Sequence, residues 1–148
     1  MKKVNQSKWP VFFMFILIAI FSCSSDEITE IDNSDLIGNW NWTTTDGGIG
    51  FNIHETPETI GKTIHLNLSK NYTFSITENG NEISNGTYVL IMKKSIYSGK
   101  LERFIQFPEN YQYTGIVMKG IIKIYESNKL DISDNNYDGI GSGFVRIE

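Results

Sequence analysis

The chain has 148 residues, with 13 basic and 17 acidic side chains and a formal net charge of −4. A chain of this length forms one domain with a modest core, and its acidic balance leaves no basic stripe for nucleic acid. Aromatic residues make up 13% of the chain and there are 13 Gly against 3 Pro, a composition that favours β structure joined by tight turns.

Residues 1–22 are predicted to be a signal peptide that is not part of the fold. Lys2, Lys3 and Lys8 precede an uncharged stretch over residues 9–21. That stretch is short for a membrane-spanning helix and has the length of a signal-peptide core. An uncleaved membrane anchor is the alternative.

The end of this segment, Ile20-Phe21-Ser22-Cys23, resembles a bacterial lipobox. The resemblance implies cleavage before Cys23 and acylation of its sulfur and its new amino group, which would fix the protein to the membrane. Cys23 is the only cysteine, so an intramolecular disulfide is excluded. Acylation would also remove a free thiol that is a liability in an oxidising compartment.

Residues 23–33 are predicted to be an acidic, flexible tether. Its Ser25-Asp26-Glu27 resembles the surface-export signals of some Gram-negative lipoproteins, and an ordinary linker is the alternative. Without the three lysines of the signal peptide, the chain has 10 basic and 17 acidic residues and a net charge of −7. We therefore expect a lipid-anchored protein of the bacterial cell envelope, at the outer membrane, whose lipid supplies the anchoring.

Residues 34–148 are predicted to be an all-β domain. Alternating apolar and polar side chains between Gly, Asn, Asp and Pro turns indicate eight short strands. Asn79-Gly80 is a strong hairpin signal, and Gly86 is an expected bulge or bend. Sequential antiparallel pairing of eight strands predicts an up-and-down barrel, with an open sandwich as the alternative. The expected strands span residues 37–45, 62–69, 72–78, 82–93, 101–107, 115–126, 129–133 and 142–147.

The first strand and the connection after it are the most informative part of this domain. Alternation places Trp40, Trp42 and Thr44 on one face of the strand. The connection over residues 49–61 is the longest, and loops of this length are usually functional or mobile, so we expect a lid. Pro57 disfavours a helix there.

The opening Gly38-Asn39-Trp40 resembles the Gly-x-Trp start of a lipocalin barrel. Together with the lipobox, the strand count and Arg146 in the last strand, the chain from about Leu36 resembles small bacterial lipoproteins with a lipocalin-like domain. The resemblance implies that Arg146 packs across Trp40 in a cation–π contact that closes the barrel. It does not extend to the other lipocalin signature regions, so it implies no ligand class.

Catalytic groups are not evident in the sequence. His54 and His65 are the only histidines, and no nucleophile–base pair, phosphate loop or cofactor motif accompanies them. Asp134 to Gly139 matches the front half of a calcium loop, but Val145 stands where the loop needs its bidentate Glu, so a plain turn is expected. We therefore expect no enzyme, no cofactor and no metal.

The expected function is binding. A small apolar ligand would lie in the barrel or at its mouth, and an apolar inner face with a long first loop motivates this prediction. The alternative is an envelope interaction or scaffold protein with a solid barrel, which would contact its partner through Trp42 or the apolar stretch from Tyr88 to Met92. The candidate ligand-lining residues are Trp42, Tyr72, Phe74 and Met118.

Overall fold

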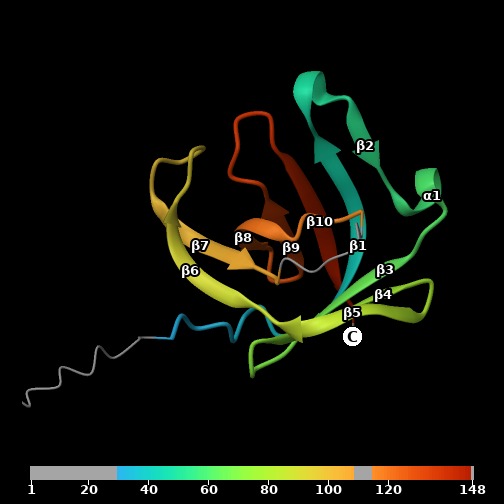
Figure 1. Ribbon diagram of the computed structural model, residues 1–148, viewed down its shortest axis with the longest axis horizontal. Helices are drawn as coiled ribbons and strands as arrows, with labels where there is room; N and C mark the ends of the chain where they lie inside the picture. The colour runs from blue at the N-terminus through green and yellow to red at the C-terminus, as the bar shows by residue number, and fades with distance from the viewer. Residues whose placement is uncertain (1–29, 109–114, 148) are drawn as a thin grey trace, which may run out of the picture.

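A computed structural model describes residues 30–108 and 115–147, which form one antiparallel β-sheet (Figure 1). Within those ranges no helix has the length and hydropathy needed to cross a bilayer. The two helical segments are single turns, η1 (Ile49–Phe51) and α1 (Pro57–Ile60). The strands are β1 (Gly38–Gly47), β2 (Ile53–Glu55), β3 (Ile64–Leu68), β4 (Thr73–Glu78), β5 (Asn81–Thr87), β6 (Val89–Lys94), β7 (Leu101–Gln106), β8 (Lys119–Tyr125), β9 (Lys129–Ser133) and β10 (Ile140–Ile147).

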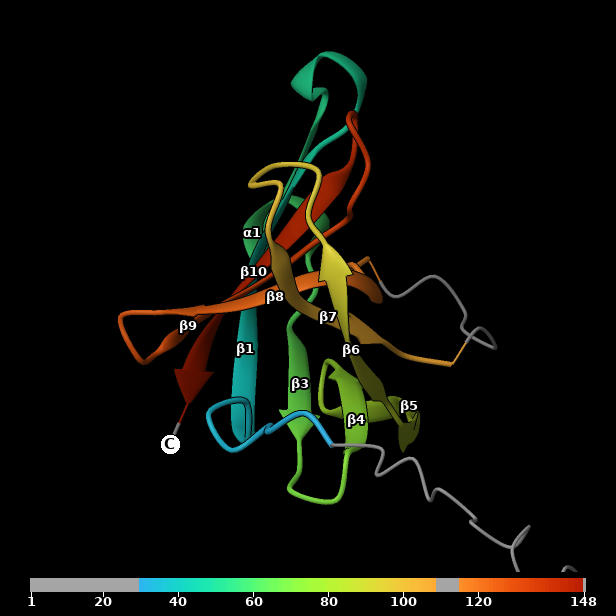
Figure 2. The same ribbon diagram turned by 90° about the vertical axis from the view of Figure 1, so that its left-hand side faces the viewer.

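The ten strands pair in the order β5-β4-β3-β1-β10-β9-β8-β7-β6, and β2 adds to β1. Apart from β2, strands that follow each other in the chain pair in the sheet, with the exception of β5 and β6, which lie at its two ends and do not pair. The pairing of β1 with β10 joins the first strand to the last. The prediction of an all-β domain with an antiparallel sheet is therefore confirmed, whereas the sheet is not closed into the expected barrel by hydrogen bonds between β5 and β6. The strand count is ten rather than the expected eight, and the sheet curves strongly around its core (Figures 1 and 2).

The expected fourth strand accounts for one of the two additional strands. Residues 82–93 form β5 and β6, which follow each other in the chain with only Tyr88 between them. Gly86 opposes Phe74 of β4, and a Cβ at this glycine would lie 3.3 Å from the Phe74 ring. The amide of Tyr88 then donates to the carbonyl of Tyr72 at 2.8 Å. The chain thus leaves β4 at this point, and β6 pairs with β7 instead.

The long connection after β1 supplies the other additional strand, because β2 pairs with the end of β1. It also contains α1, so the expectation that Pro57 disfavours a helix is wrong. Pro57 occupies the first helical turn, where its missing amide costs nothing. Thr56 and Thr59 form a reciprocal cap in front of it, and Gly61 ends the turn at φ 64°.

The core fills the space that the curved sheet surrounds, and alternation along the strands selects its members. In β3 the side chains of Ile64, Leu66 and Leu68 are buried, as the period of two predicts. In β1 a bulge between Trp42 and Thr44 shifts the pattern by one residue. Thr45 is therefore buried in place of the expected Thr44.

The chain before β1 also belongs to the domain. Asn33, which the sequence predicts to lie in the tether, is buried and donates to the Tyr88 hydroxyl at 2.7 Å. Ile31 packs against the core, and Leu36 is fully buried within it. The packed part of the chain therefore begins near Ile31 rather than at the predicted boundary, Ser34.

Candidate functional site: a groove on the outer face of the sheet

The residues predicted to close the barrel lie together. The guanidinium carbon of Arg146 lies 4.0 Å from the ring centroid of Trp40, so the expected contact is present. The same guanidinium donates to the carbonyls of Asp35, at 2.7 Å, and Ile37. Gly38 leaves room for it, because a Cβ there would lie 2.6 Å from Arg146 Nη1. This group ties the chain before β1 to the last strand.

The predicted ligand-lining residues lie in or against the core. Trp42 and Phe74 are buried, while Tyr72 and Met118 are partly buried and pack against the same cluster. Phe74 meets the edge of the Phe107 ring at a centroid distance of 4.7 Å. None of Trp42, Phe74 and Met118 borders either of the two surface pockets described below. The predicted lipid site, Cys23, lies outside the described residues.

A buried polar network holds the segment that precedes β8 against β1 and β10. The Thr45 hydroxyl accepts from Trp42 Nε1 at 3.0 Å and donates to the Gly115 carbonyl at 3.0 Å. Because the Thr45 hydroxyl has only one proton to donate, its 2.8 Å bond with Ser142 is donated by the Ser142 hydroxyl. The Ser142 oxygen also accepts from the Val117 amide at 2.9 Å. The sequence predicts a strand that begins at Gly115, whereas β8 begins at Lys119. Residues 115–117 bond to Thr45 and Ser142 through this network and do not pair with a neighbouring strand.

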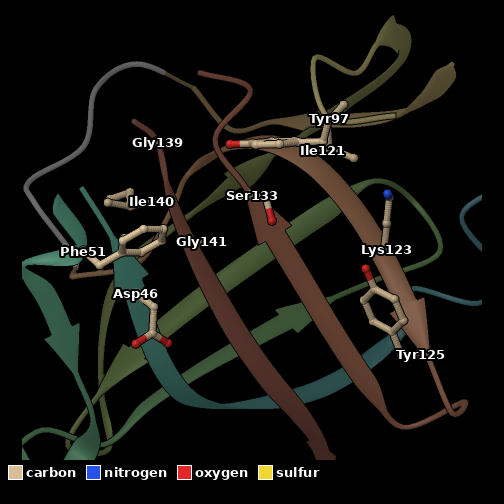
Figure 3. A pocket seen from close by; sticks show the side chains of 11 residues that line it. Asp46, Phe51, Tyr97, Ile121, Lys123, Tyr125, Ser133, Gly139, Ile140 and Gly141 are labelled. Atoms are coloured by element: carbon tan, nitrogen blue, oxygen red, sulfur yellow. The ribbon is translucent and has the colours of Figure 1, made fainter. Parts of the chain in front are cut away.

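The groove lies on the outer face of β8, β9 and β10, beside the end of β1 (Figure 3). Ser133 and Gly141 alternate with the buried Ile132 and Ser142, which places the first pair on the outer face. The groove has a volume of about 380 Å³. Its lining residues are Asp46, Gly47, Phe51, Tyr97, Ile121, Lys123, Tyr125, Ser133, Gly139, Ile140 and Gly141.

Exposed aromatic side chains stand around this groove. Phe51 lies on one side, Tyr125 on the opposite side and Tyr97 at one end, with Ser133 between them (Figure 3). Phe51 is 89% exposed and Tyr97 is 59% exposed, so their rings are available to a ligand. Gly141 keeps the floor open because it adds no side chain. The groove therefore offers aromatic and aliphatic surface around a few polar groups.

The turn that carries Tyr97 is fixed at the end of the groove. The Tyr97 hydroxyl oxygen lies 3.0 Å from the Asp134 carbonyl oxygen and 2.7 Å from the Asn136 carbonyl oxygen. Asn135 accepts from the Ile96 amide at 2.9 Å and donates to the Lys94 carbonyl at 3.0 Å. The calcium-like stretch thus forms the expected turn, which holds the β6–β7 hairpin. Within residues 30–108 and 115–147, no three His, Cys, Asp or Glu side chains cluster as a metal site.

Two charged groups give the groove opposite polarity at separate points. Hydrogen bonds from the Thr44 hydroxyl and from His54 hold the pKa of Asp46 below its usual range. Lys123 is paired with Glu102 at 2.9 Å, and this bond holds the pKa of Glu102 below its usual range. The groove therefore carries the Asp46 carboxylate and, at a separate point, the ion pair of Lys123 with Glu102.

Asp46 accepts one hydrogen bond from the Thr44 hydroxyl and one from His54. His54 contacts Asp46, and its ring is largely exposed. Such a pair orients the imidazole, but catalysis by nucleophilic attack also needs a hydroxyl or thiol next to the base. The arrangement suits binding by shape and polarity.

Sequence reasoning missed this groove. Phe51, Tyr97 and Tyr125 lie in different connections and strands, and only the pairing of β1 with β10 and of β8 with β9 brings them around one hollow. Exposed aromatic residues next to glycines are the signal that could have drawn attention to them. Comparisons with protein-family models, with curated proteins and with solved structures found no match.

Proposed function

We propose that this protein is a lipid-anchored binding protein of the bacterial cell envelope that holds a small, largely apolar ligand in the groove on its outer face. The observation that carries the proposal is the set of exposed aromatic rings, Phe51, Tyr97 and Tyr125, around an open, glycine-floored hollow. Exposed rings gathered around one concavity are a usual feature of ligand sites. Asp46 and Lys123 would orient the polar end of such a ligand.

The fold that carries this site would be a lipocalin-like barrel in which β5 and β6 act as one bent strand. Gly86, Tyr88 and Leu90 all face the core, so the alternation continues through the break. β4 pairs with the first half of this stretch and β7 with the second. With β2 counted as an addition to β1, eight strands would surround the core. The contact of Arg146 with Trp40 agrees with this comparison.

The anchor rests on the sequence. The lipobox-like end of residues 1–22 and the single Cys23 are the features expected of an acylated N-terminus. An acidic protein with a net charge of −7 after cleavage needs such an anchor at an anionic membrane. The outer membrane is the proposed location.

The second candidate function is an interaction or scaffold role without a small ligand. It is favoured by the exposed apolar side chains of β6, where Val89 is 57% and Met92 49% exposed. The two functions differ in which surface is used, and variants in the groove separate them.

The test of the binding function uses the acylated protein in lipid nanodiscs, with empty nanodiscs as the blank. Oleate, haem and the dye 8-anilinonaphthalene-1-sulfonate are the probes, measured by equilibrium dialysis. We expect saturable binding of at least one probe. Replacing Phe51 and Tyr125 together by Ala should weaken it about tenfold, since each aromatic contact contributes on the order of 0.5–1.5 kcal/mol.

Tyr137→Ala is the matched control, because Tyr137 is also 89% exposed and does not line the groove. It should leave binding unchanged. Absence of saturable binding to all three probes, or equal binding by the groove variant, would refute the ligand function and favour the scaffold role.

A further inference from the structure

A second hollow lies beside β6, at the place where the described chain begins. It has a volume of about 510 Å³ and is lined by Glu30, Ile31, Asn71, Tyr72, Tyr88, Val89, Leu90, Ile91 and Met92. We define the β6 surface as Tyr72, Val89, Ile91 and Met92 together with this start of the chain. It is separate from the groove proposed to hold a ligand, since the two share no lining residue.

The start of the chain is fixed next to this surface. The Tyr72 hydroxyl donates to the Ile31 carbonyl at 2.7 Å, and Arg103 donates to the Asp32 carbonyl at 3.3 Å. Asn33 is then held by the Tyr88 hydroxyl and by the Ser69 carbonyl. Both ribbon views show the described chain beginning beside β6 (Figures 1 and 2). Any tether that precedes Glu30 therefore emerges at the β6 surface.

The tether is short compared with the protein. Cys23, the proposed acylation site, precedes Glu30 by seven residues. A chain extends by at most about 3.3–3.6 Å per residue, so Glu30 lies within about 25 Å of the anchoring cysteine. The face of the domain nearest to Glu30 must then lie close to the bilayer. This step rests on the proposed lipid anchor.

The side chains on this face suit a lipid surface. Val89 and Ile91 project from one face of the edge strand β6 and Met92 from the other, and these side chains are 57%, 43% and 49% exposed. Lys93 and Lys94 follow them and are also exposed, and within the described part of the chain neither forms a salt bridge, although Lys93 Nζ lies 4.4 Å from the centroid of the Phe104 ring. Exposed aliphatic side chains next to lysines are typical of surfaces that lie at the level of lipid headgroups.

Charge also orients the domain. The protein as a whole is acidic and is repelled by anionic lipid, whereas Lys93 and Lys94 place two exposed basic side chains at the end of β6, one on each face of the strand. In the described sheet β6 pairs with β7 on one side only, which leaves backbone groups along its other edge. Such an edge cannot enter hydrocarbon, but headgroups and water satisfy it at the interface.

We propose that the β6 surface is a membrane-contact face, which lies against the headgroup layer of the bilayer that holds the lipid anchor. Because the anchor confines the domain near the membrane, a contact that is weak in solution becomes highly populated. The contact would hold the domain in one orientation, with the β4–β5 turn directed away from the tether (Figure 1).

The test uses the full acylated protein in vesicles of phosphatidylethanolamine and phosphatidylglycerol. An acylated Cys23 has no free thiol, so a single introduced cysteine accepts an environment-sensitive nitrobenzoxadiazole label. Ile91→Cys is the test position, and Met92→Cys is a second position in case the first variant does not fold. We expect severalfold brighter emission at shorter wavelength, and quenching by nitroxide-labelled lipids.

Ile83→Cys is the matched control, since Ile83 on β5 is 43% exposed like Ile91. Its label should not respond to vesicles. Replacing Lys93 and Lys94 by Gln should reduce the response of the Ile91 label in vesicles with phosphatidylglycerol and have little effect in pure phosphatidylcholine.

The remaining outcomes overturn the inference in distinguishable ways. A protein that floats with vesicles while neither label responds retains its anchor and has no membrane-contact face. Equal response of both labels would show that the domain has no fixed face. A response that disappears as the protein is diluted within the membrane, or that requires added envelope proteins, would assign the surface to a second copy or to a protein partner. A protein that does not float lacks the lipid anchor, and both proposals then fail.

Discussion

Removal of the Thr45 hydroxyl is predicted to lower the free energy of unfolding strongly. This hydroxyl is buried and links Trp42, Gly115 and Ser142 through three hydrogen bonds of 2.8–3.0 Å. Thr45→Val keeps the size of the side chain but leaves these groups without their partner. A buried group that loses its hydrogen bond costs about 1–3 kcal/mol, and the Ser142 hydroxyl can recover part of this by donating elsewhere. We therefore expect a loss of about 2–4 kcal/mol.

The measurement is urea unfolding of the anchored protein in nanodiscs, followed by tryptophan fluorescence, with an unchanged m value as the condition for comparison. Thr45→Ser keeps the hydroxyl and should cost about 1 kcal/mol for the lost methyl group. Thr43→Val removes one partly buried hydrogen bond, to the Gly143 carbonyl, and should cost about 1 kcal/mol. If Thr45→Val destabilises the protein no more than Thr43→Val does, the network does not have the role assigned to it.

Two further predictions concern packing. Gly120→Ala should destabilise the protein by about 3 kcal/mol or more, because the added Cβ would lie 2.2 Å from the Ser133 carbonyl oxygen. Gly141→Ala is the control and should change the unfolding midpoint little, because the nearest atom to its Cβ would be 3.4 Å away. In the same assay, Trp40→Ala should lower the free energy of unfolding by about 3–5 kcal/mol and Arg146→Ala by about 1–2 kcal/mol. An Arg146→Ala variant with an unchanged unfolding midpoint and unchanged tryptophan emission would contradict the closing role of this contact.

Local patterns in the sequence predicted the parts of the fold that local chemistry determines. The alternation in β3 gives the buried set Ile64, Leu66 and Leu68. Asn79 and Gly80 both have positive φ, 52° and 83°, as the two-residue hairpin signal requires. The contact between Trp40 and Arg146 was predicted from a family resemblance, and no family model matches the chain.

The differences arise where contacts distant in sequence override alternation. The bulge that buries Thr45 is stabilised by Gly115 and Ser142, which are 70 and 97 residues away along the chain. The interruption at Tyr88 depends on its bond to Tyr72 and on the exchange of β4 for β7 as the neighbouring strand. No window of a few residues contains this information.

The groove was not predictable for the same reason. Its walls come from the connection after β1, from the β6–β7 turn and from β8, and strand pairing alone sets their distances. Trp42 was favoured because it is large and aromatic. In the fold it is buried, and its indole nitrogen donates to Thr45. Size and aromaticity predict burial better than they predict ligand contact.

Asp35 and Asp131 are predicted to change the free energy of unfolding with pH in opposite directions. Arg103 holds both carboxylate oxygens of Asp35 at 2.6 Å, and this bond keeps the pKa of Asp35 below its ordinary value. Burial raises the pKa of Asp131, and Lys123 offsets only part of that effect. Ionised Asp35 therefore stabilises the folded state, while ionised Asp131 destabilises it.

The stabilisation from Asp35 is complete above the unfolded-state pKa of about 3.9 and is lost as the pH falls towards the lowered folded-state value. Asp35→Asn should therefore lower the free energy of unfolding at pH 7, by about 1 kcal/mol at most because the pair is partly exposed. The penalty from Asp131 is present above its raised folded-state pKa and disappears as the pH falls towards about 3.9. Asp131→Asn should therefore raise the free energy of unfolding at pH 7 and converge with the parent protein in acid. Urea unfolding of both variants from pH 7 to pH 3 tests the signs together, and a shift in the same direction for both would show that burial and pairing are not what separates these two carboxyl groups.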